Sequence, residues 1–144
     1  MAKIQAFLET IVEGNYPQIV VHEAVEALGN MGEENTVRLI EQYRNNNSEI
    51  SAMVIETCEL AQDLIKWNKE TNFGASENLD LKKLRFNTND PAPPFKMDAK
   101  PEYSDVGYLT QMMLDSTNHS LFERYRAMFT LRDIYTEESC VAIC

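Results

Sequence analysis

Three side chains near the start of the chain combine groups that can bind a metal. His22 stands next to Glu23, and Glu26 follows one helical turn later. On a helix, this spacing places an imidazole and two carboxylates on neighbouring faces. Imidazole and carboxylate are the ligands of non-haem iron sites, which commonly use two histidines and one carboxylate on one face of the metal. One imidazole falls short of that set, so the spacing alone favours the alternative in which His22 is an ordinary half-buried residue.

The elements around these residues are expected to be helices. Apolar side chains recur at intervals of three and four residues through the first 70 positions, as on one face of an amphipathic helix. Pro17 suits the first turn of a helix, and Gly14 and Gly32 suit helix ends. We therefore predict two helical hairpins with helices over 4–14, 17–32, 33–45 and 50–67. The inward residues expected for the first two helices are Ile4, Phe7, Leu8, Ile11, Val20, Ala24, Ala27, Leu28 and Met31.

The two hairpins are related by a repeat. Residues 22–28 align with residues 55–61 at an offset of 33 positions, so that Glu23 coincides with Glu56. A repeat of this length between helical hairpins indicates an α-solenoid, in which each hairpin buries its apolar face against the next. A third copy places Glu123 in the same slot. We therefore expect an all-α fold, and Glu23 has a purely structural interpretation as the recurring glutamate of the repeat.

A proline-rich segment divides the expected helices into two groups. Four of the five prolines lie between residues 71 and 104, and structureless loops of this length are uncommon inside one compact domain. The sequence thus predicts two repeats over 1–70, a linker over 71–103, and one repeat with the start of another over 104–144. Because a solenoid normally needs a polar terminal repeat, we expect the chain to be an internal piece of a longer solenoid or to complete itself by association.

Charge and composition exclude several classes of function. The net charge is −10, and no basic cluster is available to bind a phosphate backbone, which argues against a nucleic-acid partner. The sequence has no continuous apolar run of membrane-spanning length, and because its first residues lack the apolar stretch of a signal peptide, we expect none. The odd number of cysteines, with Cys58 expected in the core and Cys140 and Cys144 near the end, predicts reduced thiols. We expect a cytoplasmic protein without a membrane partner.

Four segments in order along the chain carry a family resemblance. They are His22-Glu23-Ala24-Val25-Glu26-Ala27-Leu28-Gly29, Glu56-Thr57-Cys58-Glu59-Leu60-Ala61, Asp90-Pro91-Ala92-Pro93-Pro94, and Leu121-Phe122-Glu123-Arg124-Tyr125-Arg126-Ala127-Met128-Phe129 with Leu131-Arg132. Together they resemble the deoxyhypusine hydroxylase family. The resemblance implies a HEAT-type α-solenoid and an Fe(II)-dependent monooxygenase with a di-iron centre. It also implies a substrate: the deoxyhypusine side chain of a translation initiation factor precursor, which the enzyme converts to hypusine.

The resemblance also implies roles for particular residues. His22 and Glu23 match one of the family's four His-Glu motifs and would be iron ligands, whereas Glu26 is similar to an acidic residue that attracts the cationic substrate. No catalytic residue is implied beyond the metal ligands. Val21 departs from the arginine that the family usually has there, and His119 stands at a position that does not bind metal. Since the other motifs have no counterpart, we expect the isolated chain to be inactive unless copies associate, for which a homodimer is possible.

A non-catalytic HEAT-repeat module that binds a protein partner is the alternative function. The repeat itself accepts an apolar residue at the position of His22, as Ile55 and Phe122 show. A scaffold therefore has no need of an imidazole at this position. His22 is the residue that distinguishes the two hypotheses.

Overall fold

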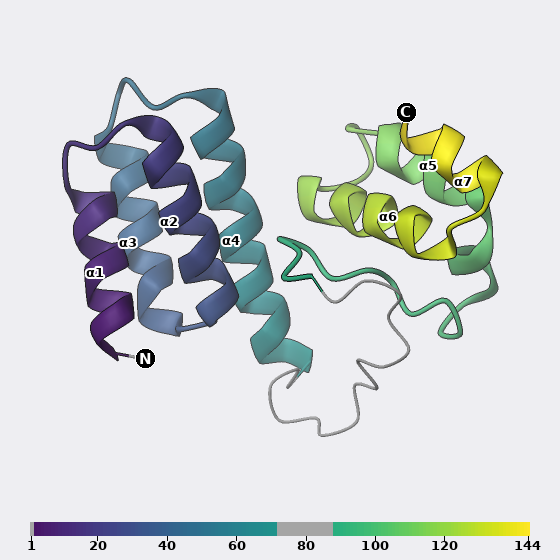
Figure 1. Ribbon diagram of the computed structural model, residues 1–144, viewed down its shortest axis with the longest axis horizontal. Helices are drawn as coiled ribbons and strands as arrows, with labels where there is room; N and C mark the ends of the chain where they lie inside the picture. The colour runs from purple at the N-terminus through teal and green to yellow at the C-terminus, as the bar shows by residue number, and fades with distance from the viewer. Residues whose placement is uncertain (1, 72–87) are drawn as a thin grey trace. The chain divides into compact units, whose positions relative to one another are not determined.

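A computed structural model describes residues 2–71 and 88–144, and every regular element within these ranges is helical (Figure 1). The predicted all-α class is therefore confirmed. The chain divides into two compact units, Met1–Glu77 and Asn78–Cys144, which are described separately below. Among the described residues, no helix has the length and apolar character needed to span a membrane.

The first unit consists of two stacked helical hairpins. Helix α1 pairs with α2, helix α3 pairs with α4, and the hairpins meet through contacts of α1 with α3 and of α2 with α4. The long α4 lies beside α2 along most of its length (Figure 1). This is the stacking that the 33-residue repeat predicts. The helix bounds are Ala2–Glu13 for α1, Gln18–Met31 for α2, Glu34–Asn46 for α3 and Ala52–Thr71 for α4.

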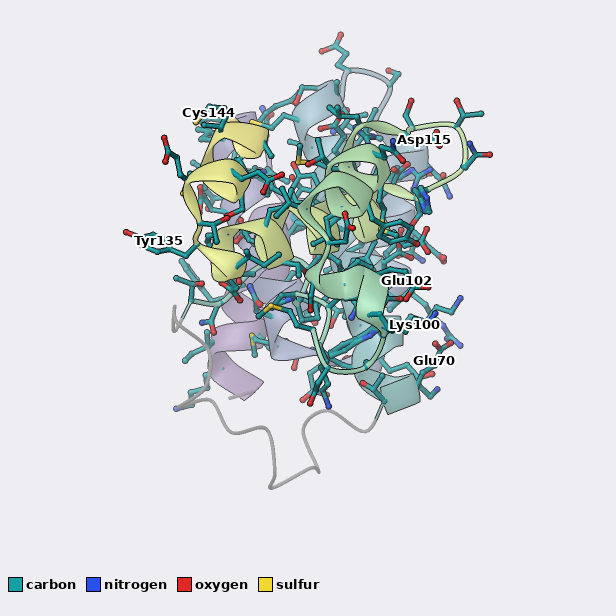
Figure 2. The ribbon with its side chains drawn as sticks, turned by 90° about the vertical axis from the view of Figure 1, so that its right-hand side faces the viewer. Glu70, Lys100, Glu102, Asp115, Tyr135 and Cys144 are labelled. Carbon is teal, nitrogen blue, oxygen red and sulfur yellow. The ribbon has the colours of Figure 1, made fainter. Side chains whose placement is uncertain are left out.

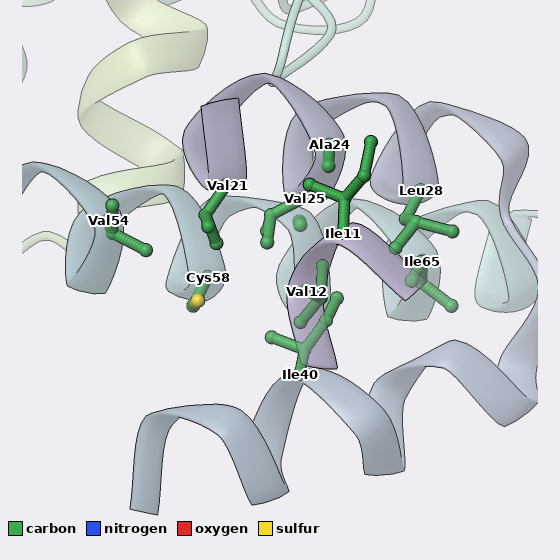
Figure 3. Packing of buried hydrophobic residues seen from close by; sticks show 11 residues of the cluster. Ile11, Val12, Val21, Ala24, Val25, Leu28, Ile40, Val54, Cys58 and Ile65 are labelled. Carbon is green, nitrogen blue, oxygen red and sulfur yellow. The ribbon is translucent and has the colours of Figure 1, made fainter. Parts of the chain in front are cut away.

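The core of the first unit lies between these four helices (Figure 3). Its fully buried members include Val12, Val25 and Cys58, so the expectation that Cys58 belongs to the core is confirmed. The predicted inward face of α1 is partly wrong, because Ile4 and Phe7 are 61% and 63% exposed. The C-terminal half of α1 supplies the buried contacts instead, which come from Ile11 and Val12 with Leu8 packed beside them.

The buried face of α2 is also rotated about the helix axis from its predicted position. Val21 and Val25 are fully buried, whereas Val20 is 36% exposed. Consecutive helical positions are about 100° apart, so exchanging Val20 for Val21 turns the helix face by one position. Ala24 and Leu28 were predicted correctly and are buried. As a result, His22 lies at the edge of the buried face rather than on the outer side of the helix.

Close approach of α2 to α4 depends on a small residue. A Cβ atom placed on Gly29 would lie only 2.8 Å from the Cβ of Ala61 and 2.9 Å from its Cα. Glycine at this position therefore lets the two backbones meet. Three residues later, Gly32 ends α2 in the left-handed conformation with φ 72°, and its N–H donates to the carbonyl of Gly29 at 3.1 Å.

The described part of the second unit, residues 88–144, contains three α-helices and a short 3-10 helix, η2. Helices α5 and α6 pair as a hairpin, and α7 packs against both. Side chains cap the starts of α6 and α7, since Ser120 and Glu123 form one reciprocal capping box and Thr136 and Ser139 form the other. The bounds are Pro101–Ser104 for η2, Val106–Leu114 for α5, Leu121–Ile134 for α6 and Glu137–Ile143 for α7.

The described part of the predicted linker packs onto the second unit. Within residues 88–103, Ala92 and Phe95 are buried. The Phe95 N–H donates to the hydroxyl of Thr130 on α6 at 2.8 Å, and the Phe95 ring stacks on Tyr103 with ring centroids 4.3 Å apart. Residues 88–103 thus contribute to the core around α6. The remainder of the predicted linker, 72–87, lies outside the described residues.

Helix α6 buries a face that the sequence analysis did not select. We expect Leu121, Tyr125, Met128 and Phe129 to mark its inner side, but all four are only partly buried. Apolar side chains surround this helix, so its pattern does not single out one face. Packing against α5 and residues 88–103 decides the outcome. The residues that become buried are Phe122, Ala127, Thr130 and Leu131.

Candidate functional site

The helix that carries His22 begins directly after Pro17. The Pro17 carbonyl accepts hydrogen bonds from the N–H groups of Val20 at 2.9 Å and Val21 at 3.2 Å, which starts the helical turn just before His22. Burial of Val21 and Val25 then fixes the rotation of α2 about its axis. His22 consequently remains 25% exposed at the side-chain level, with one edge toward α4 and the other toward solvent.

Two carboxylates lie beside the solvent-facing nitrogen of His22. The Nε2 atom is 3.9 Å from Oε1 of Glu23 and 3.8 Å from Oε2 of Glu26. The Glu23 side chain is 70% exposed, whereas that of Glu26 is 33% exposed. The structure thus brings the three sequence-predicted residues together, and we call them the His22 cluster. One oxygen of each carboxylate thus lies within 3.9 Å of Nε2.

The other ring nitrogen of His22 contacts a residue that the sequence analysis did not assign to the site. Nδ1 lies 2.6 Å from Oγ1 of Thr57 on α4, within hydrogen-bond distance. Thr57 is 6% exposed and belongs to the α4 stripe that helical spacing predicts to face inward. A signal was present, because a hydroxyl buried in an apolar stripe needs hydrogen-bond partners. Which partner it finds depends on how the two hairpins stack.

The second histidine lies in the second unit, near the start of α6. Nδ1 of His119 is 3.7 Å from Oε2 of Glu123, and its side chain is 27% exposed. Its position near a helix start predicts a solvent-facing side chain, but the structure shows a half-buried one beside the N-terminal capping box. Because Glu123 already accepts the N–H of Ser120 at 3.0 Å, this carboxylate has a structural role at the helix start.

The three cysteines have different environments. Cys58 is fully buried, and burial raises the pKa of its thiol to about 11. A thiol in such surroundings is neither a nucleophile nor a metal ligand near neutral pH. Cys140 and Cys144 are exposed, and Figure 2 shows Cys144 on the outside of the second unit. All three are free thiols, as the sequence analysis expects.

The His22 cluster fits iron in the kind of its ligands but not in their number. An imidazole nitrogen with an unshared electron pair and carboxylate oxygens are the donors that non-haem iron takes. Within residues 2–71 and 88–144, however, no group of three or more histidine, cysteine or acidic side chains is arranged to hold a metal ion. The cluster can therefore supply part of a coordination sphere, and further ligands must come from elsewhere.

A hollow on the first unit does not include the cluster. It has a volume of about 350 Å³ and is lined from α1 and α3, with Val12, Tyr43 and Asn47 among its residues. Titratable side chains on its wall are confined to Glu13 and Tyr43. None of the predicted site residues faces this hollow.

Comparison with known proteins relates the chain to one enzyme family. It is 39% identical over 138 residues to the deoxyhypusine hydroxylase of Debaryomyces hansenii and 34% identical over 133 residues to that of Saccharomyces cerevisiae. These alignments cover 95% and 92% of this chain, but 42% and 38% of the relatives. No family model matches the chain. The resemblance that the sequence motifs indicate is therefore confirmed, and the chain spans about two fifths of its curated relatives.

A solved structure shows the same relationship. The structure of human deoxyhypusine hydroxylase in complex with glycerol matches this chain with a TM-score of 0.78 at 33% sequence identity. The match covers 99% of this chain and 44% of the human chain. The predicted fold of stacked helical hairpins is thereby confirmed.

Proposed function

Because the chain is similar to deoxyhypusine hydroxylases over nearly its whole length, we propose that it forms part of such an enzyme. The activity is a monooxygenase reaction that hydroxylates the deoxyhypusine side chain of a translation initiation factor precursor. The His22 cluster is the observation that supports assigning this function to particular residues. In this cluster Nε2 of His22 lies 3.9 Å from an oxygen of Glu23 and 3.8 Å from an oxygen of Glu26. No observation favours the alternative of a non-catalytic interaction module.

In this proposal His22 and Glu23 are iron ligands. Nε2 of His22 faces solvent on the side of the carboxylates, and Glu23 is exposed enough to turn toward a metal. Bound Fe(II), paired in a di-iron centre, would supply the activation of dioxygen. The chain's own contribution is to place an imidazole and a carboxylate side by side on a helix that packs against its neighbours. A ligand on a packed helix is placed more accurately than one on a loop.

Glu26 is proposed to attract the substrate. Its carboxylate is partly exposed and lies one turn from Glu23, so that it can face a ligand bound beside the metal. The deoxyhypusine side chain carries amines, which are cationic at neutral pH. A carboxylate at this place would orient such an amine, and the net charge of −10 would favour the approach of a basic partner.

Completion of the centre requires ligands beyond the His22 cluster. The described residues hold no group of three or more suitable side chains. We therefore propose that a second copy or other segments of the enzyme bring the remaining histidines and carboxylates. Light scattering tests the first route, for which the expected result is a mass above the 16.5 kDa of one chain when iron is present.

Anaerobic titration with ferrous iron tests the ligand assignment. The wild-type chain is compared with His22→Ala and with His119→Ala, which removes the other histidine and leaves the cluster intact. Bound iron per chain is measured after desalting, and circular dichroism confirms that each variant is folded. We expect wild type and His119→Ala to retain iron and His22→Ala to lose it. Equal retention by all three chains, or no retention by wild type, would show that His22 does not bind iron in this chain.

A further inference from the structure

Thr57 has a defined hydrogen-bond role beside His22. Its hydroxyl donates to the carbonyl oxygen of Met53, one turn earlier on α4, at a distance of 2.8 Å. A hydroxyl carries a single proton but has two acceptor lone pairs. Since the proton is directed to Met53, Oγ1 meets the ring of His22 as an acceptor. With the proton of Thr57 assigned in this way, Nδ1 of His22, at 2.6 Å, is the donor.

Donation from Nδ1 determines the state of the opposite ring nitrogen. A neutral imidazole carries its proton on one ring nitrogen and an unshared electron pair on the other. The hydrogen bond made by either nitrogen determines which of the two is protonated. Protonation at Nδ1 leaves the unshared pair on Nε2. This is the atom that lies 3.9 Å from Glu23 and 3.8 Å from Glu26. The tautomer therefore presents the metal-binding nitrogen to the carboxylates.

We infer that Thr57 is a positioning residue for the metal site, holding His22 in the Nδ1-protonated tautomer with Nε2 directed to Glu23 and Glu26. The inference rests on the proposed function for its link to iron. Histidines that bind metals commonly donate their other ring N–H to a neighbouring oxygen, which fixes ring orientation. Here that oxygen is Oγ1 of Thr57, on the next hairpin of the solenoid. Stacking of α4 on α2 therefore orients the His22 ring before a metal binds.

The site also explains why Thr57 is threonine rather than an apolar residue. It occupies a buried position in contact with an otherwise apolar stripe, where Val54 and Cys58 are fully buried. Burying a hydroxyl there is unfavourable unless it is hydrogen-bonded. The hydroxyl of Thr57 donates its proton to the carbonyl of Met53, and its oxygen accepts a hydrogen bond from His22. Serine can replace both functions, whereas valine matches threonine in shape and supplies neither.

The tautomer can be measured directly in the metal-free chain. The full 144-residue chain is labelled with ¹⁵N-histidine, and long-range ¹H–¹⁵N correlation spectra are recorded at about pH 8, above the ordinary range of histidine protonation. His119→Ala assigns the two rings, since the chain has only two histidines. We expect His22 to be protonated at Nδ1 in wild type and Thr57→Ser. In Thr57→Val we expect that tautomer to lose its dominance.

Iron affinity supplies the second readout. Loss of such an outer partner typically weakens metal binding roughly 10- to 100-fold, so Thr57→Val is expected to weaken Fe(II) binding by that factor while Thr57→Ser retains it. A wild-type spectrum that shows His22 protonated at Nε2 overturns the inference. This test needs no variant, so it stands even if Thr57→Val does not fold. Unchanged iron affinity in folded Thr57→Val overturns it as well. If wild type binds no iron, the proposed function fails for this chain, and the tautomer spectrum still decides whether Thr57 orients the ring.

Discussion

Arg132 and Asp90 form a bidentate ion pair, with Nη1 2.9 Å from Oδ1 and Nη2 2.9 Å from Oδ2. The pair joins the irregular segment before Phe95 to the last turn of α6. Both side chains are mostly buried, at 24% and 11% exposure. Parallel charge-assisted hydrogen bonds of this kind are stronger than single neutral ones. The contact therefore explains why part of the predicted linker packs with the second unit.

Asp90→Asn should destabilise the second unit. The substitution keeps the shape of the side chain but removes the charge and one of the two acceptors for Arg132. Hydrogen bonds to charged groups contribute about 1.5–3 kcal/mol, so we expect the free energy of unfolding to fall by roughly 1–2 kcal/mol. Urea denaturation measures this, with Asp98→Asn as the control, because Asp98 is an exposed acid of the same segment. Equal stability of the two variants would contradict the structural role of the pair.

Gly29→Ala should separate α2 from α4. The added Cβ would lie 2.8 Å from the Cβ of Ala61, closer than real side-chain atoms approach. Overpacking of this kind typically costs about 1–3 kcal/mol, despite the better helix propensity of alanine. Asn30→Ala, at the next and exposed position of α2, serves as control. Thermal melting should show a lowered Tm only for Gly29→Ala. An unchanged Tm of Gly29→Ala would contradict the prediction, because it would mean that α2 and α4 can accommodate the added Cβ without strain.

Thr130→Val should expose the amide of Phe95 to exchange. That N–H donates to the Thr130 hydroxyl at 2.8 Å in a buried setting, and valine removes the acceptor. A buried donor left without a partner costs about 1–3 kcal/mol. Hydrogen exchange of the Phe95 amide is expected to become faster in Thr130→Val and to stay slow in Thr130→Ser. Slow exchange in both variants would show that Phe95 does not depend on this acceptor.

Thiol reagents should distinguish Cys58 from the other cysteines. Cys140 and Cys144 are exposed, whereas Cys58 is fully buried with a thiol pKa of about 11. Near neutral pH the thiolate is the reactive form, so we expect two labelled cysteines in the native chain and three after unfolding. Mass spectrometry after maleimide treatment gives the count. Labelling of Cys58 in the folded chain would contradict the packing of α2 against α4.

Cys58 should also make stability depend on alkaline pH. Burial raises the pKa of its thiol from 9.0 to about 11, so the unfolded chain loses this proton first. The contribution to stability is therefore complete below about pH 9 and is lost as the pH rises through 11. We expect urea midpoints measured across this interval to fall more steeply in wild type than in Cys58→Ala. Parallel pH profiles would contradict the assigned environment.

The sequence by itself determined the helical hairpins and their repeat. The apolar spacing, Pro17 and Gly32 act within one segment of the chain. They therefore determine where a helix begins and ends regardless of where its neighbours lie. The sequence also identified the His22 cluster, because helical spacing alone places Glu23 and Glu26 beside His22. It could not choose between adjacent apolar residues such as Val20 and Val21. Either one continues a helical stripe, and only the position of a neighbouring helix decides which is buried.

Tertiary structure alone decided the hydrogen-bond partner of His22. Thr57 lies 35 positions after His22, and its spacing on α4 is that of any inward-facing residue. The hydrogen bond arises because stacking of the two hairpins brings one edge of α2 against the N-terminal part of α4. In the same way, only packing shows that Arg132 reaches Asp90 across 42 positions of the chain. Periodicity describes each helix in isolation, whereas contacts between helices depend on how their surfaces fit together.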